Sequence, residues 1–157
     1  NHFHESYIYA AWPMMQLGNL HIKLENYEKA KILLEQSLLI YAKNYGKDHL
    51  ALAQILDDLG QVYLLEGHTE KAENLLQKAI EIFQRNKHPG SYLCLKNLAA
   101  LFIKKSMLAK NQGDLEQSQN FKNQAISYLN EALKVVNMYF PPNSLHPQRI
   151  QEKITKL

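Results

Sequence analysis

The sequence predicts an all-α chain built from repeated helical hairpins, and three observations support this fold class. Apolar residues recur every three or four positions over residues 48–86, which is the period of an amphipathic helix rather than a strand. Glycines, prolines and short polar clusters interrupt this period at intervals, as turns between helices do. Segments of the pattern also recur along the chain at a nearly constant spacing, so the hairpins are copies of one unit.

Two short phrases define the spacing of the copies. Residues 16–19 (QLGN) resemble residues 58–61 (DLGQ), and residues 27–30 (YEKA) resemble residues 69–72 (TEKA), both at a spacing of 42. A third copy, NLAALF, begins at Asn97 at a spacing of 39. Because a single hairpin cannot bury both faces of its helices, we expect the copies to pack in series.

The second hairpin carries the clearest turn and contact signals. Gly67 separates its two helical stripes and can adopt the left-handed conformation that ends a helix, after which Thr69 can cap the next helix. Gly60 in the first helix and Ala72 in the second leave room for the two backbones to approach closely. The other two hairpins are therefore compared with this one.

Polar residues are expected to cap the first helix of each hairpin. Asp48 precedes Gly60 by 12 residues, and Ser6 precedes the equivalent Gly18 by the same 12, so both are expected caps. Ser91 is the corresponding candidate in the third hairpin. The hairpins are therefore expected over about residues 7–45, 48–87 and 91–139.

Pro13 complicates the start of the first helix, which the Ser6 cap would place near Tyr7. Proline lacks a backbone N–H and clashes with the carbonyl four residues earlier. The helix therefore either bends between Tyr9 and Pro13 or begins only at Trp12. We favour the bend.

The third hairpin is expected to be longer than the others. Gly113 at its turn follows Ala99 by 14 residues, whereas Gly67 follows Gly60 by 7. After the turn, the interval to the next small contact residue grows from 5 to 12. Each helix has gained seven residues, or two turns, so the buried faces keep their orientation while the tip extends by ~10 Å.

This lengthening predicts helices over about 91–111 and 115–139, with a second close contact at Ser106 and Ser118. A flexible polar insertion over about 110–123 is the alternative. A proline-rich segment at 140–147 is then expected to interrupt the helices. The helix that follows, over about 147–156, is expected to close the domain or to be the first half of a fourth repeat.

These residues resemble the tetratricopeptide (TPR) family. Its pattern is matched in the second unit by Leu56, Leu59, Gly60, Tyr63, Ala72, Leu76 and Ala79, and in the first by Met14, Leu17, Gly18, Ala30, Leu34 and Ser37, with His21 where an aromatic is expected. Family repeats are usually ~34 residues long, so the longer spacing and the Asn-Leu-Ala phrase look more like the kinesin light chain subclass. The resemblance implies a right-handed α-solenoid of about three hairpins plus a closing helix.

Composition is compatible with one domain over residues 1–157. The formal charge of +3 is too small to indicate nucleic acid or a membrane surface as partner. No apolar run approaches a membrane span, and the single cysteine, Cys94, is expected in the core. We expect a cytoplasmic protein and, because the chain lacks an initiator Met, a piece of a longer one.

No sequence motif indicates catalysis, a cofactor or a metal. Phosphate-binding glycine loops, nucleophile elbows and zinc motifs are missing from the sequence. Asp57 and Asp58 are adjacent, so on a helix they point about 100° apart and do not converge on a proton. His2 and His4 lie at the terminus without a third ligand. We expect no enzyme.

The resemblance implies a concave groove, lined by the first helix of each unit, that holds a peptide of a partner protein. Side-chain amides suit this role because they satisfy both donors and acceptors of a peptide backbone. The expected groove residues are Trp12, Gln16, Asn19, Lys23, Gln54, Asp57, Asp58, Gln61, Lys96, Asn97 and Lys104.

The sequence leaves three functional readings open. We expect a scaffold or adaptor that binds a peptide segment of a partner, and the alternative is an internal spacer or regulatory arm of a larger enzyme or regulator. The lengthened third hairpin could also carry self-association through Met107, Leu108 and Phe121.

Overall fold

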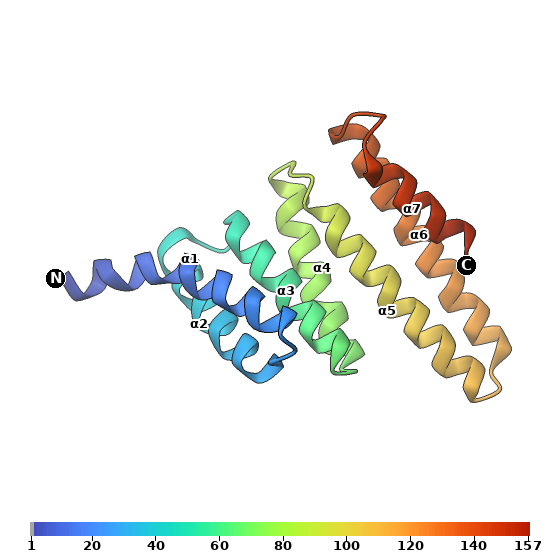
Figure 1. Cartoon of the computed structure of the whole chain (residues 1–157), viewed down its shortest axis with the longest axis horizontal. Coiled ribbons are helices and arrows are strands. Elements are labelled where there is room, and N and C mark those ends of the chain that lie inside the picture. Colours follow the sequence, from blue (N-terminus) through green and yellow to red (C-terminus); the bar gives the residue numbers. More distant parts are fainter. Residues whose placement is uncertain (1) are drawn as a thin grey trace. The chain divides into compact units, whose positions relative to one another are not determined.

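Seven α-helices make up the regular structure of the described chain (Figure 1). The computed structural model describes residues 2–157, with side chains from Ile8 onward. The helices are α1 (His2–Lys23), α2 (Tyr27–Tyr45), α3 (Leu50–Leu65), α4 (Thr69–Arg85), α5 (Ser91–Asn111), α6 (Leu115–Tyr139) and α7 (Leu145–Thr155). The predicted all-α fold of helical hairpins is confirmed.

The helices form two compact units, Asn1–Lys87 and His88–Leu157. In unit 1, α1 pairs with α2 and α3 with α4, while α2 also packs on α3 and α1 touches α3. In unit 2, α5 pairs with α6 over their length and α7 packs on α6. Each helix therefore packs mainly on its neighbour in sequence, as expected for stacked hairpins.

Each of the two hairpins of unit 1 has the same close contact between its first and second helix. A Cβ atom on Gly18 would lie 2.8 Å from Cγ of Leu34 and 2.9 Å from its Cδ2; a Cβ on Gly60 would meet Leu76 at the same two distances. Both leucines are fully buried. Because real Cβ contacts are longer than this, only glycine allows the helices to approach so closely. The 42-residue sequence repeat therefore corresponds to a glycine–leucine packing contact that recurs in each hairpin.

The third hairpin confirms the lengthening predicted from the sequence. Its helices α5 and α6 have the predicted bounds, so the alternative of a flexible insertion is wrong. Ser106 and Ser118 are buried, their hydroxyl oxygens lie 2.9 Å apart, and Ser106 Oγ donates to the Ser118 carbonyl at 2.9 Å. The small residues near the tip therefore form the expected second contact, here with a hydrogen bond added.

The predicted turn at Gly67 is confirmed, but the side-chain caps are wrong. Gly67 has φ +87°. Thr69 is the first residue of α4 rather than its cap, and Gly90 rather than Ser91 precedes α5. Asp48 instead forms an ion pair with Arg85 at 2.6 Å.

Histidines near the expected cap positions accept hydrogen bonds from the backbone in the loops before α3 and α5. His49 Nδ1 accepts the backbone N–H of Ala51 at 3.2 Å and thereby caps α3. His88 Nδ1 likewise accepts the N–H of Gly90 at 3.0 Å. The His49 ring also stacks on Tyr41, with centroids 5.4 Å apart. An imidazole nitrogen that accepts a hydrogen bond does here what a carboxylate or hydroxyl does at other helix starts.

Helix α1 begins at His2, so the predicted start near Tyr7 with a Ser6 cap is wrong, as is the alternative start at Trp12. The helix runs on through Pro13, whose missing N–H leaves one carbonyl of the preceding turn without its helical donor. Nearby, the buried Ser37 hydroxyl donates to the carbonyl of Ala11 at 2.7 Å. A side chain of α2 thus binds the backbone of α1 beside the proline.

Helix α7 closes unit 2 but begins at Leu145, two residues earlier than expected. Pro147 lies in its first turn, where backbone N–H groups have no acceptor within the helix, so the proline is tolerated. Ile150 is 1% exposed. The rings of Tyr92, Phe140 and His146 lie within 5.6 Å of one another by centroid and hold the start of α7 against the hairpin. Cys94 is buried, as predicted.

The serine contact near the tip of the third hairpin yields a stability prediction. Ser106→Leu replaces one oxygen by three carbons where α5 and α6 meet and removes the hydrogen bond to Ser118, so it should lower the free energy of unfolding by about 2–3 kcal/mol. Urea denaturation followed by circular dichroism measures the loss. Ser127→Leu, at an exposed position of α6, is the matched control and should change stability by less than ~0.5 kcal/mol. Equal losses in the two variants would contradict the predicted contact.

Candidate functional site

The predicted groove residues of unit 1 lie on matching faces of α1 and α3, which touch in the structure. Their spacings of three and four residues place them on one side of each helix. Trp12 is 60% exposed, and all three glutamines and the lysine are also exposed, whereas the asparagine and the two aspartates are half-buried. We call this set the α1–α3 face: Trp12, Gln16, Asn19 and Lys23 of α1 with Gln54, Asp57, Asp58 and Gln61 of α3.

Asn19 and Asp58 are the two groove residues that the structure joins directly. The Asn19 side chain hydrogen-bonds the Asp58 carboxyl group, linking α1 to α3. Asn19 Oδ1 is buried and has no hydrogen-bond donor among the described groups. A carboxylate can only accept, so the bond to Asp58 comes from the Asn19 amide N–H and leaves the amide oxygen unsatisfied. This hydrogen bond favours the ionised form of Asp58.

Burial and the neighbouring charge act on the pKa of Asp58 in the opposite direction to this hydrogen bond. Burial raises the pKa of Asp58 from its ordinary value of 3.8, the neighbouring Asp57 carboxylate raises it further, and the Asn19 hydrogen bond offsets part of the rise, so that the pKa is about 7. The charge of Asp57 thus acts on Asp58, which follows it on the same helix. Near neutral pH the α1–α3 face thus carries a carboxyl group that titrates.

An ion-pair network between α2 and the C-terminal end of α3 binds the two hairpins of unit 1 together. Lys31 Nζ on α2 lies 2.6 Å from Glu28 and 2.9 and 3.0 Å from the two carboxylate oxygens of Glu66, at the end of α3. The side chains of Lys31 and Glu66 are only 15% and 18% exposed. These contacts raise the pKa of Lys31, first through the Glu28 hydrogen bond and then through Glu66, so this lysine stays charged. Sequence reasoning missed this network.

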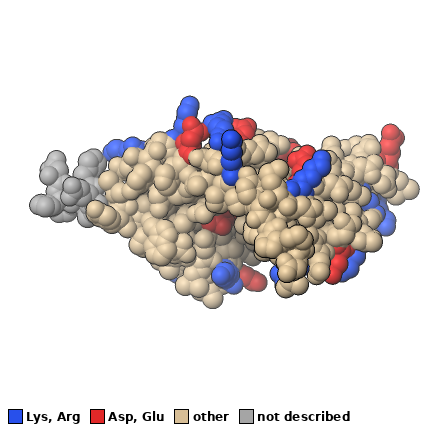
Figure 2. Space-filling view, turned by 90° about the horizontal axis from the view of Figure 1, so that it is seen from above, with Lys and Arg blue, Asp and Glu red and all other residues tan. Residues whose placement is uncertain are grey.

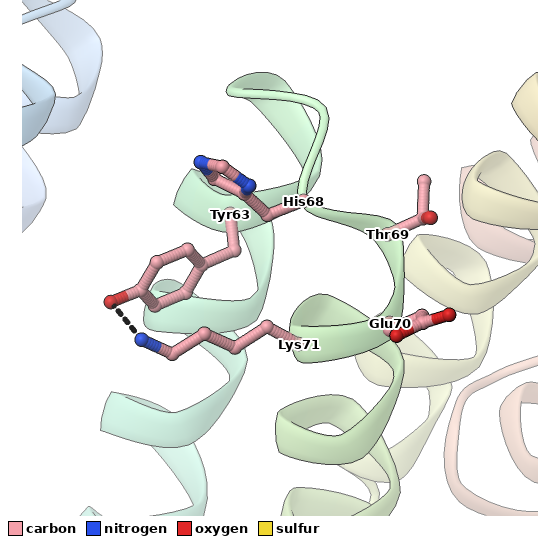
Figure 3. A pocket seen from close by; sticks show the side chains of 5 residues that line it. All are labelled: Tyr63, His68, Thr69, Glu70 and Lys71. Atoms are coloured by element: carbon pink, nitrogen blue, oxygen red, sulfur yellow. Dashed lines mark hydrogen bonds between the residues drawn. The ribbon is translucent and has the colours of Figure 1, made fainter.

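A small hollow of about 420 Å³ lies beside this network, at the turn between α3 and α4. Figure 3 shows Tyr63, His68 and Lys71 on one side of the turn, with Thr69 and Glu70 pointing to the other. Lys71 Nζ donates to the Tyr63 hydroxyl at 2.7 Å and lies 4.0 Å from its ring centroid. Since the lysine and the tyrosine already satisfy each other, we assign the hollow a structural rather than a ligand-binding role.

The three predicted groove residues of unit 2, Lys96, Asn97 and Lys104, are half-buried on α5. Lys96 lines a hollow of about 210 Å³ together with Lys153 and Lys156 from the end of α7. Its Nζ lies 5.8 Å from the ring centroid of Tyr92. Unit 2 therefore gathers basic groups between α5 and α7, which the sequence pattern did not reveal because it left the packing of α7 open.

Charges of both signs are mixed on the surface of the described residues shown in Figure 2. On the face seen in Figure 2, basic and acidic side chains lie beside one another and form no large patch of one sign. In the part of the chain whose side chains are described, no group of three or more metal-ligating residues occurs; His2 and His4 lie outside it. No helix of the described residues is long and apolar enough to cross a bilayer.

Comparison with known sequences gives two similarities. The profile of the family described as Tetratricopeptide repeat matches residues 9–85. The Photosystem I assembly protein Ycf3 of Prochlorococcus marinus is 23% identical over 110 residues, which are 70% of this chain. The match spans 58% of the length of that relative.

Three solved structures share the fold at low sequence identity. The N-terminal domain of stress-induced protein-1 from C. elegans superposes with a TM-score of 0.61 at 16% identity, covering 96% of this chain and 95% of that domain. A putative kinesin light chain with nearly identical TPR-like repeats from P. anserina gives 0.56 at 15% identity, covering 96% and 85%. BtubC from P. vanneervenii gives 0.53 at 16% identity, covering 93% and 62%. These likenesses concern the fold.

The surroundings of Asp58 yield a pH prediction. Because its folded pKa of about 7 lies above the ordinary 3.8, the folded state binds more protons than the unfolded state between these values, so stability should fall as pH rises from about 4 to 7. Asp58→Asn should remove this dependence and stabilise the protein at pH 8 by roughly 2–4 kcal/mol.

Carbon NMR of the carboxyl groups should find the midpoint of Asp58 near pH 7. Asp57→Asn removes a repelling charge and should lower that midpoint, whereas Asn19→Ala removes a hydrogen bond to the carboxylate and should raise it. A midpoint below about 5 in the native protein would contradict the burial argument.

Proposed function

Because residues 9–85 of this chain are tetratricopeptide repeats, which act in protein–protein interaction, we propose that the chain binds a peptide segment of a partner protein along its α1–α3 face. One observation carries the proposal: two touching helices present amides, a carboxyl group and an indole at matching positions, and the glutamines and Trp12 are exposed.

The chemistry of the face suits a backbone ligand. Gln54 and Gln61 lie two turns apart on α3 and can each donate to a peptide carbonyl and accept from a peptide N–H. Trp12 offers a large apolar surface with one donor, the combination that dominates binding energy at protein interfaces. The Asn19–Asp58 pair fixes the two helices that carry these groups.

The charge of the face favours a ligand with at least one basic residue. Asp57 and Asp58 lie between the two glutamines, and a cation placed near Asp58 would favour its ionised form. Binding of such a ligand should therefore release a proton and tighten as pH rises through 7. The curated relative Ycf3 is named as an assembly protein, and assembly of other proteins is a role that contacts of this kind can serve.

A peptide selection tests the proposal. Random dodecapeptides displayed on phage are selected on the full chain, and the selected sequences are synthesised and titrated by fluorescence anisotropy. We expect affinities weakened by at least about tenfold in Gln54→Ala plus Gln61→Ala, since both side chains would lose hydrogen bonds to the ligand. The matched control is Gln77→Ala plus Gln84→Ala, an exposed pair with the same seven-residue spacing on α4.

The control pair should leave the affinity within about twofold. If the two double variants bind every selected peptide equally well, the α1–α3 face is not the binding surface.

A further inference from the structure

The lengthened hairpin of unit 2 extends beyond the helix that covers it. Helix α7 starts beside Tyr92 and Phe140 and ends near Lys122, whose Nζ donates to the Leu157 backbone oxygen at 3.1 Å. The distal ends of α5 and α6 continue past that point, as Figure 1 shows at the C-terminus. The seven residues added to each helix thus leave a hairpin tip that α7 does not reach.

A cleft of about 480 Å³ lies where α7 ends and the tip begins. We call it the overhang cleft; it is lined by residues of α5, of α6 and of the last turn of the chain. Ser106 and Ser118 lie at its base, where they are buried and bonded to each other. The cleft therefore exists because the helices were lengthened, and it is separate from the α1–α3 face of unit 1.

The charged groups of the overhang cleft are all basic. Lys110 of α5, Lys122 of α6 and Lys156 line it, and no acidic side chain does. None of these three lysines forms an ion pair with a carboxylate of the described residues. Lys122 also donates to the Leu157 backbone oxygen, but no acidic side chain offsets the three like charges, so a ligand that supplies carboxylates would be attracted.

The uncharged part of the cleft is apolar. Ile103, Met107, Leu115 and Leu157 line it, and Met107 and Leu115 are 63% and 66% exposed. Phe121, one of the residues expected to carry self-association, is half-buried, and its ring centroid lies 5.9 Å from that of Phe102. The accessible apolar side chains of the tip are therefore Met107, Leu108 and Leu115. A methionine among flexible aliphatic neighbours can adapt to an apolar side chain of a ligand.

We propose that the overhang cleft is a second docking site, which binds an acidic amphipathic segment of a partner protein. Its carboxylates pair with Lys110, Lys122 and Lys156, and its apolar side chains cover Met107 and Leu115. The three lysines favour acidic residues in the ligand through charge complementarity. The apolar lining favours a protein segment over a nucleic acid. No arginine and no aromatic ring on which a base could stack lines the cleft.

The test uses four fluorescein-labelled 14-residue peptides on the full chain. One carries Glu and Leu at helical spacing; the others replace Glu by Gln, Glu by Lys, or Leu by Ser. We expect the Glu–Leu peptide to bind at least about tenfold more tightly than each of the other three, with an affinity that falls as salt rises.

Variants of the lysines place the peptide on the cleft. Lys110→Ser plus Lys122→Ser should weaken the Glu–Leu peptide at least about tenfold, whereas Lys78→Ser plus Lys134→Ser, two exposed lysines elsewhere, should change it less than about twofold. Lys110→Glu plus Lys122→Glu should reverse the preference in favour of the Lys–Leu peptide. The Gln54→Ala plus Gln61→Ala variant should bind the Glu–Leu peptide as the native chain does.

Several outcomes would overturn the proposal. They are equal binding of the Glu and Gln peptides, loss of binding in the glutamine variant, or no preference reversal in the charge-swapped variant. Tighter binding of a labelled 20-nucleotide single-stranded DNA through the same lysines would assign the cleft to nucleic acid. Sedimentation showing a dimer that Lys110→Ser plus Lys122→Ser disperses would assign it to a second copy of the chain.

Discussion

The close contact between a glycine on the first helix of a hairpin and a leucine on the second is the constraint on which unit 1 depends. Gly18 with Leu34 and Gly60 with Leu76 repeat the same two distances 42 residues apart. Where the backbones approach this closely, Leu34 and Leu76 are fully buried, and the exposed faces of α1 and α3 are left at matching positions. The candidate site therefore follows from the packing: side chains at matching positions come together because the hairpins are built alike.

The third hairpin shows how the same constraint allows growth. Adding seven residues to each helix preserves which face is buried, because seven residues are close to two turns. The added turns need their own small residues, and Ser106 and Ser118 provide them with a hydrogen bond that glycine or alanine could not make. An insertion that respects the helical period thus produces a new surface, the overhang cleft, without disturbing the core beneath it.

Much of this architecture could be predicted from the sequence, because helical period, repeat spacing and small residues act locally. The bounds of α5 and α6 and the Ser106–Ser118 contact followed from counting residues. The caps did not, because a histidine side chain can replace an acidic one: His49, and not Asp48, caps α3 with its imidazole nitrogen. The raised pKa of Asp58 depends on burial and on Asn19 of another helix, which no local pattern contains.

A double-mutant cycle at Gly60 and Leu76 tests the central constraint most directly. Gly60→Ala alone should destabilise the protein by about 1–3 kcal/mol, because the new Cβ would lie 2.8 Å from Cγ of the fully buried Leu76. In the Leu76→Ala background that neighbour is gone, and the same change should stabilise by up to about 1 kcal/mol, the ordinary preference of a helix for alanine. Additive effects, with Gly60→Ala equally costly in both backgrounds, would contradict the account.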